Sequence, residues 1–165
     1  FDGFAHVGLY LTFVQETEQL GTGGALWNAR DHLEDEFILL WGDDYHPIDY
    51  APLVQHHRNE SSALTMTVTT EHEVMNLQFE DGRLLKYSKE GDAPREFNGY
   101  EAGTSVVSKS IVMAHGKEGG WSWEKTIYPA LADQIHVHLD ATKFWDMGTP
   151  ERLQKLEMFF NETRR

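Results

Sequence analysis

Residues 36–44 read EFILLWGDD, a near-continuous apolar run that ends abruptly in one glycine and two aspartates. The run over 36–41 is typical of a β-strand that other layers of structure cover on both faces. Carboxylates that directly follow such a strand lie at the carboxyl edge of a sheet, where open α/β sheets bind their ligands. The stretch therefore predicts an α/β protein and places Asp43 and Asp44 at a candidate ligand site.

Patterns that alternate between strand and helix extend from this stretch in both directions. Upstream, residues 9–14 alternate apolar and polar side chains as a strand does, and glycines at 21–24 open a predicted helix over 25–33. Downstream, helices are predicted over 49–60, 123–132 and 150–160, and strands over 64–69, 100–107 and 135–139. This alternation predicts a Rossmann-like, mainly parallel sheet with helices on both faces.

A small β ribbon interrupts the alternation. Strand patterns over 74–79 and 84–87 flank Glu80-Asp-Gly-Arg83, in which Asp-Gly tolerates the positive φ of a tight hairpin turn. Residues 89–98 are predicted to form a polar loop. No repeat or linker divides the 165 residues, so we expect one domain over 1–165.

The amino-acid composition excludes several classes of function. The 14 basic and 27 acidic residues give a formal charge of −13, which repels nucleic acid polymers. No apolar run approaches the about 20 residues that a membrane span needs, and no basic region followed by an apolar stretch marks a secretory signal. The absence of cysteine excludes disulfides, thiolate zinc sites and cysteine nucleophiles. We therefore expect a cytoplasmic protein that binds neither nucleic acid polymers nor membranes.

Two further motifs could bind a ligand, one through backbone N–H groups and the other through a carboxylate. The glycines of Leu20-Gly-Thr-Gly-Gly24 would let backbone N–H groups approach a phosphate or a nucleobase, although a turn that packs a strand against a helix has the same pattern. Asp146 ends a short strand before a helix whose start Thr149 caps. Taken alone, Asp43 is better explained as a turn residue, and Asp146 could serve only to stabilise its loop by hydrogen bonds. At the rim of one sheet, however, the two could share Mg²⁺, which prefers oxygen ligands.

The histidines raise a different hypothesis. His56 and His57 fall in a predicted helix, and His136 and His138 lie two apart on a predicted strand, as in some zinc sites. No carboxylate spacing completes a recognised zinc motif, so we interpret the strand pair as solvated or hydrogen-bonded. A serine hydrolase is not supported, because no Gly-x-Ser-x-Gly sequence occurs.

Six short motifs follow one another along nearly the whole chain. They are residues 16–25 (ETEQLGTGGA), 37–43 (FILLWGD), 87–89 (YSK), 101–103 (EAG), 122–131 (SWEKTIYPAL) and 145–150 (WDMGTP). Together and in this order they resemble the sugar-1-phosphate nucleotidyltransferases, which make nucleotide sugars from a nucleoside triphosphate and a sugar 1-phosphate. The resemblance is greatest to the mannose- or heptose-1-phosphate guanylyltransferase-like branch, which favours GTP.

The resemblance implies roles for particular residues. Asp43 and Asp146 would be the Mg²⁺ ligands, and Lys89 would meet the phosphate of the sugar. The implied substrate-binding residues are Gly21, Thr22 and Gly23 for the base and ribose, Glu101 and Gly103 for the sugar hydroxyls, and Glu124 as a supporting carboxylate.

Two departures from the family pattern qualify this expectation. Ser88 stands where the family usually has Glu before the loop lysine, and no Gly-x-Gly-Thr-Arg loop with a following Pro-Lys motif occurs in residues 1–165. Because that loop holds the triphosphate, we expect the chain to be the C-terminal two-thirds of the domain, with its N-terminal part missing. It would be inactive and poorly folded unless an upstream segment or a partner chain, such as a second copy in a homo-oligomer, completes it. A noncatalytic nucleotide-sugar-binding or regulatory subunit remains the alternative.

Overall fold

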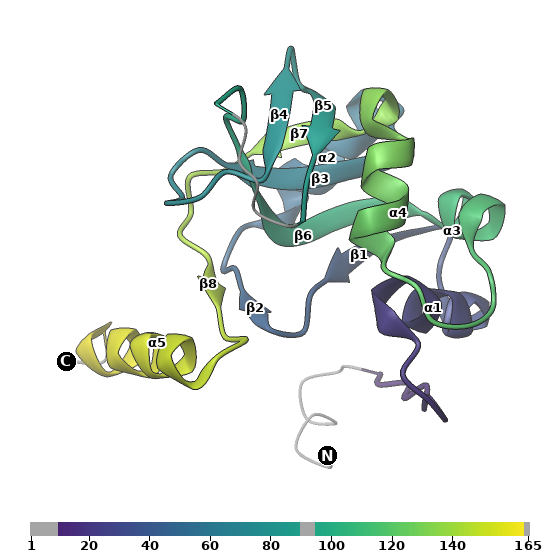
Figure 1. Ribbon diagram of the computed structural model, residues 1–165, viewed down its shortest axis with the longest axis horizontal. Helices are drawn as coiled ribbons and strands as arrows, with labels where there is room; N and C mark the ends of the chain where they lie inside the picture. Colours follow the sequence, from purple (N-terminus) through teal and green to yellow (C-terminus); the bar gives the residue numbers. More distant parts are fainter. Residues whose placement is uncertain (1–9, 90–94, 164–165) are drawn as a thin grey trace.

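The computed structural model describes residues 10–89 and 95–163, which form one six-stranded sheet, one two-stranded ribbon and surrounding helices (Figure 1). The large sheet has the order β1-β6-β3-β7-β5-β4. Its strands are β1 (Glu36–Leu40), β3 (Leu64–Thr69), β4 (Leu77–Glu80), β5 (Arg83–Tyr87), β6 (Tyr100–Ser108) and β7 (His136–Leu139). The ribbon pairs β2 (Asp44–Tyr45) with β8 (Trp145–Asp146).

Helices cover both faces of the large sheet. They are α1 (Gly21–Asn28), α2 (Tyr50–Asn59), α3 (Lys109–His115), α4 (Trp123–Ala130) and α5 (Pro150–Thr163), with short 3-10 turns η2 (Arg30–His32) and η3 (Ala132–Gln134). In the view of Figure 1, α4 lies in front of the sheet and α2 behind it, while α5 projects away beside β8. None of the helices in the described part of the chain is long and apolar enough to cross a membrane.

The α/β class with helices on both faces and a small hairpin is confirmed, but the strand directions are not mainly parallel. β1, β3 and β7 run in one direction, and β3 pairs with β7 in parallel. β6 runs the opposite way between β1 and β3, and β5 pairs antiparallel with both β4 and β7. A strand that is buried on both faces has the same apolar sequence pattern in either direction, so the pattern alone does not report direction.

The core has one cluster on each face of the sheet. The larger contains Trp123, Ile127 and Tyr128 of α4, all fully buried against the sheet, and the smaller contains Leu53 of α2 and Val106 of β6. All six residues of β3 are buried, as a central strand between two helical layers requires.

Several element predictions are confirmed with small shifts at their ends. The strand over 64–69 is β3, and the predicted hairpin is β4–β5, with Asp81 and Gly82 both at positive φ in its turn. Asp49 caps α2 by accepting a hydrogen bond from the N–H of Ala51 at 2.9 Å.

Two predictions near the N-terminus are wrong, and one helix in the middle of the chain was not predicted. Residues 10–14 form no strand, and Leu9 lies outside the described residues; without a neighbouring strand, Tyr10 is 99% exposed. α1 begins at Gly21, because the carbonyl of Trp121 accepts from the N–H of Gly23 and so supports the first helical turn. α3 was not predicted, because it follows β6 directly, and its N-cap residue Ser108 makes no capping hydrogen bond.

β1 forms an edge of the sheet in the described structure. Its one described neighbour is β6, and Ile38 and Leu40 are 37% and 50% exposed. An edge strand with apolar side chains and unpaired backbone groups is a surface on which another strand can pair.

Candidate active site

One polar pocket of about 500 Å³ lies where β1 ends and β6 begins. The predicted residues that line it are Thr22, Asp43, Lys89, Glu101, Glu124 and Asp146. They come from six separate parts of the sequence, so the fold brings together most of the predicted site. Gly21, Gly23 and Gly103 are not among the lining residues.

The β2–β8 ribbon places Asp43 next to Asp146. The pairing sets Asp44 opposite Asp146, and the N–H of Met147 donates to the carbonyl of Asp43 at 2.6 Å. Both carboxylates point toward Gly148, where an added Cβ would lie 3.0 Å from Asp146 Oδ1 and 3.3 Å from Asp43 Oδ2. Two aspartates that are distant in sequence thus converge on one small region of the pocket.

The Asp146 carboxylate is oriented by neighbours on both oxygens. Oδ1 accepts from the N–H of Gly148 at 2.7 Å, and Oδ2 accepts from the guanidinium of Arg152 in the first turn of α5. In the part of the chain that the structure describes, no group of three or more His, Asp or Glu side chains is already placed to hold a metal ion. Two carboxylates suit Mg²⁺ nevertheless, because this ion binds proteins through one or two carboxylates and takes its other ligands from water and phosphates.

Asp44 is the third aspartate that lines the pocket; the sequence placed it beside Asp43 at the candidate ligand site without giving it a role of its own. Burial, with the negative charges of Asp43 and Asp146, raises the pKa of Asp44 to about 7, against the lowering effect of Arg152. Its carboxylate fills the space in front of Gly103, so any Cβ at position 103 would overlap it. Gly103 also has φ +73°, a conformation that only glycine adopts readily.

Glu101 is buried and has no cation beside it among the ion pairs of the described residues. Its Oε1 accepts from Trp41 Nε1 at 3.0 Å and from the N–H of Gly103 at 3.2 Å. Burial raises the pKa of Glu101 to about 8, with a further contribution from Asp44 and against the hydrogen bond from Trp41. Glu101 is therefore largely a neutral acid at pH 7, able to donate one hydrogen bond as well as accept others.

Glu124 joins two of the other predicted residues. Its carboxylate accepts hydrogen bonds from Lys89 Nζ and Thr22 Oγ1, and from Ser122 Oγ at 3.0 Å. Burial alone would raise the pKa of Glu124, but the hydrogen bonds from Lys89 and Thr22 outweigh it and lower the pKa. Glu124 thus holds Lys89 at the wall of the pocket as an ion pair.

The glycines of α1 serve packing in this structure. The N–H of Gly23 donates to the carbonyl of Trp121 at 2.9 Å, and a Cβ at Gly21 would lie 2.7 Å from the same oxygen. A Cβ at Gly23 would overlap the Trp121 ring. This close approach corresponds to the packing interpretation of the motif, and Thr22 is the residue of the motif that reaches the pocket.

Sequence reasoning missed the aromatic wall of the pocket. The rings of His72 and Tyr100 stack with centroids 3.8 Å apart, and Phe144 lies 5.6 Å from each of them. Phe144 and Arg152 lie just outside the motif that contains Asp146. Their closeness to this motif in the sequence could have identified them as pocket residues. His72 had no comparable signal, because it lies in an irregular loop after β3.

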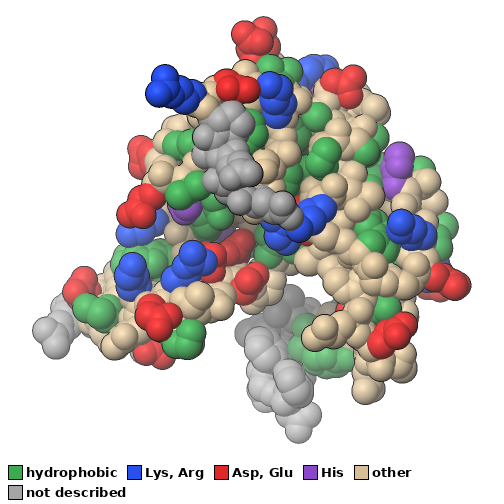
Figure 2. Space-filling model, viewed as in Figure 1, with side chains coloured by type: hydrophobic (Ala, Val, Ile, Leu, Met, Phe, Trp, Pro, Cys, Tyr) green, Lys and Arg blue, Asp and Glu red, His purple; other side chains and the backbone are tan. Residues whose placement is uncertain are grey.

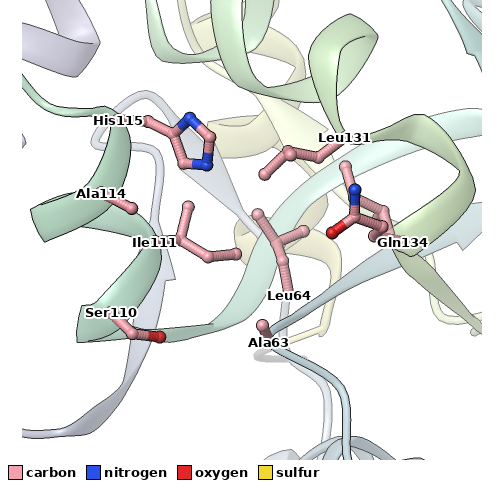
Figure 3. A pocket seen from close by; sticks show the side chains of 9 residues that line it. Ala63, Leu64, Ser110, Ile111, Ala114, His115, Leu131 and Gln134 are labelled. Atoms are coloured by element: carbon pink, nitrogen blue, oxygen red, sulfur yellow. The ribbon is translucent and has the colours of Figure 1, made fainter.

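A second pocket, of about 210 Å³, is mainly apolar and contains none of the predicted residues. Figure 3 shows it between α3, which contributes Ile111 and His115, and the segment that carries Leu131 and Gln134. Leu64, the first residue of β3, lines its floor, so it lies at the end of β3 away from the polar pocket. Its side chains offer no set of charged groups for phosphate chemistry.

Comparison with known proteins shows which enzymes the chain resembles in sequence. No family model matches the chain. It is 33% identical over 156 residues to a mannose-1-phosphate guanylyltransferase catalytic subunit beta of Drosophila pseudoobscura pseudoobscura, covering 88% of this chain and 41% of that protein. It is 30% identical over 162 residues to a mannose-1-phosphate guanylyltransferase of Mycobacterium tuberculosis, covering 91% and 44%. The chain therefore spans about two fifths of the length of the curated relatives that it matches.

Solved structures show the same similarity. HddC from Yersinia pseudotuberculosis, also solved in complex with GMP-PN, superposes with a TM-score of 0.77 at 25% identity, over 96% of this chain and 72% of that chain. A putative glucose-1-phosphate thymidylyltransferase from Bacillus anthracis shares the fold with a TM-score of 0.74 at 13% identity, over 94% and 67%. The chain is therefore similar in sequence to mannose-1-phosphate guanylyltransferases, and its structural neighbours are sugar-1-phosphate nucleotidyltransferases.

Proposed function

We propose that the natural protein forms a nucleotide sugar and pyrophosphate from a nucleoside triphosphate, with GTP favoured, and a sugar 1-phosphate. The observation that carries the proposal is the convergence of six separately predicted residues on one pocket. The similarity to guanylyltransferases supports the same activity and favours guanine as the base. Residues 1–165 would form the C-terminal two-thirds of the catalytic domain, in the cytoplasm, and a homo-oligomer would suit this role.

The reaction needs no protein nucleophile. A phosphate oxygen of the sugar 1-phosphate attacks the α-phosphorus of the triphosphate in line, a new P–O bond forms, and the bond to the leaving pyrophosphate breaks. Asp43 and Asp146 would hold Mg²⁺, which supplies neutralisation of the charge that collects on the phosphates. The convergence of both carboxylates beside Gly148 supports this assignment.

The opposite wall of the pocket would bind the sugar 1-phosphate. Lys89 would contact the phosphate as a point charge, with Glu124 holding its ammonium group in position. Glu101 would bond a sugar hydroxyl, because a neutral carboxylic acid both donates and accepts. Gly103 would keep the backbone of β6 open to the sugar and to Asp44.

A pyrophosphate-release assay on the full-length natural protein, with GTP, a sugar 1-phosphate and Mg²⁺, tests the proposal. Asp43→Asn and Asp146→Asn should each lower turnover by about 100-fold or more, because charge neutralisation by a metal contributes several kcal/mol. Asp133→Asn, on the exposed turn η3, is the matched control and should keep full turnover.

Circular dichroism and thermal unfolding should show that all three variants remain folded. Near-normal turnover in either site variant would refute the metal assignment. Absence of turnover in the unmodified full-length protein, together with tight binding of a nucleotide sugar, would instead show a noncatalytic binding subunit.

A further inference from the structure

Four side chains of the kinds that bind transition metals lie together on α2 and β7, outside the polar pocket. His56 and Glu60 are four residues apart, at the end of α2, and therefore share one face of that helix. His136 and His138 are two residues apart on β7 and share one face of the sheet. Ring contacts between His56 and both strand histidines show that the two faces meet.

The separations within this histidine cluster (His56, Glu60, His136 and His138) can be compared with those of a metal site. Zn–N bonds are about 2.0–2.1 Å long, so two imidazoles on one tetrahedral ion have ring centroids about 5 Å apart, and their ligating atoms lie about 3–3.5 Å apart. The His56 and His138 rings are 5.5 Å apart, and His136 Nε2 lies 3.5 Å from Glu60 Oε2. Both pairs are already close to the separations that a shared ion requires.

The separation between the His56 and His136 rings is larger than a shared ion allows. The His56 and His136 rings are 6.5 Å apart, so one of them must move by about 1 Å to reach the same ion. This distance is consistent with the finding that no three such side chains, among residues 10–89 and 95–163, are already placed for a metal. His56 is partly exposed whereas His136 is buried, so rotation of the His56 side chain can close the gap without moving the core.

Three buried ring nitrogens of the cluster make no hydrogen bond in the described structure. His56 Nε2 and both ring nitrogens of His136 are buried and have no hydrogen-bond partner among the described residues. A buried polar atom without a partner costs about 1–3 kcal/mol, so native proteins usually satisfy such atoms. His57, the neighbouring histidine, differs because its Nδ1 bonds Thr65 Oγ1 at 2.9 Å.

The charges around the cluster favour a cation overall. A metal ion binds the neutral form of an imidazole, through a ring nitrogen that carries a lone pair. Glu60 faces His136, and Asp140 lies near His138 as a carboxylate that can orient it. Arg83 of β5 faces His136 and opposes a cation, but it is one positive charge against these two carboxylates.

We propose that His56, Glu60, His136 and His138 bind one divalent transition-metal ion, with Zn²⁺ the best match to three imidazoles and one carboxylate. The site ties the C-terminal end of α2 to β7. It is separate from the proposed Mg²⁺ ligands Asp43 and Asp146, which lie in the polar pocket. Its test is therefore independent of the catalytic proposal.

Isothermal titration calorimetry with Zn²⁺, on the tag-free full-length protein after chelator treatment and dialysis, measures the site. One ion should bind per chain. His138→Ala and Glu60→Gln should each weaken binding by at least about tenfold, because each removes a ligand. Glu60 is exposed, so Glu60→Gln leaves the core intact if an alanine variant fails to fold.

His32→Ala, which removes an exposed histidine of η2, is the matched control and should bind Zn²⁺ as the unmodified protein does. Asp43→Asn should also leave Zn²⁺ binding unchanged. X-ray absorption of the bound zinc should show nitrogen ligands at about 2.0–2.1 Å. The proposal is overturned if Zn²⁺ does not bind, if binding survives both cluster variants, or if Asp43→Asn abolishes it.

Discussion

Gly103 is the residue at which backbone conformation and site geometry are most closely linked. It combines φ +73° with a position directly against the Asp44 carboxylate, and its N–H holds Glu101. A side chain at 103 would both strain the backbone and displace a carboxylate of the pocket. One glycine thus allows Asp44 and Glu101 to occupy the same small volume.

Gly103→Ala should lower the free energy of unfolding by about 2–4 kcal/mol, the combined cost of a left-handed alanine and of overpacking. Gly42→Ala is the matched control, since no atom lies within 4 Å of a Cβ there and its φ is not positive. Urea unfolding monitored by tryptophan fluorescence compares the two. Equal effects at both positions would contradict the role of the Asp44 contact.

The raised pKa of Glu101 predicts that the stability of the folded protein depends on pH. Its pKa is raised from 4.5 to about 8 in the folded protein, so the folded state holds a proton that the unfolded state releases above about pH 4.5. The stability that Glu101 contributes is therefore fully present below this pH and is lost as the pH rises through about 8. Gln at this position cannot lose a proton.

The stability of the unmodified protein relative to Glu101→Gln should consequently fall between pH 5 and pH 8, by an amount on the order of a few kcal/mol. Urea unfolding of both proteins at four pH values in this range measures the difference. The same comparison for Glu34→Gln, at an exposed position, is the control. A difference that does not change with pH would show that Glu101 is already charged when folded.

At the scale of elements, β3 and the β4–β5 hairpin were predicted well and α3 was not. A central strand and an Asp-Gly turn each have a local cause that the sequence displays, namely a run rich in β-branched residues and two residues that tolerate positive φ. α3 has only Ser108 at its N-cap, and the side chain of that residue makes no capping hydrogen bond. It forms because Ile111 and Val112 pack onto the core after β6 ends, which is a tertiary effect.

Thr65 and Thr67 on β3 give a matched test of how α2 is joined to the sheet. Both are buried, but Thr65 Oγ1 shares a 2.9 Å hydrogen bond with His57 Nδ1, whereas Thr67 Oγ1 has no hydrogen-bond partner among the described residues. Thr65→Val should destabilise the protein by about 1–3 kcal/mol because it leaves a buried imidazole nitrogen unpaired.

Thr67→Val, in contrast, removes a hydroxyl that is already unpaired, and it should be neutral or stabilising. Thermal unfolding by calorimetry compares the two variants. A loss of stability for Thr67→Val equal to that for Thr65→Val would show that strand packing, rather than the hydrogen bond, sets the cost.

At the scale of the whole molecule, acidic residues dominate, and Figure 2 shows charged side chains of both signs over α5 with hydrophobic ones between them. The cations of the polar pocket are already engaged, since Lys89 pairs with Glu124 and Arg152 with Asp146. A bound triphosphate needs further preorganised hydrogen-bond donors, because stabilisation of charge by such donors is usually a major part of catalysis. β1 also leaves one edge without a strand among the described residues.

We therefore expect residues 1–165 alone to release pyrophosphate at least about 100-fold more slowly than the full-length natural protein. We also expect this segment to self-associate through the free edge of β1. A pyrophosphate-release assay and analytical ultracentrifugation of both proteins measure these properties. Turnover equal to that of the full-length protein would show that the segment contains a complete site.

The sequence by itself determined the α/β class, most strands and helices, and a candidate set of pocket residues of which six proved to lie together. These features follow from short-range causes, such as the Asp-Gly turn of the β4–β5 hairpin or the capping of α2 by Asp49, whereas the apolar strand before Asp43, expected to be covered on both faces, is an exposed edge. Only the tertiary structure decided that β6 runs antiparallel between β1 and β3, and that Asp44 and Glu101 flank Gly103. Strand order and direction depend on packing free energy summed over the whole chain, and no local run of residues contains that sum.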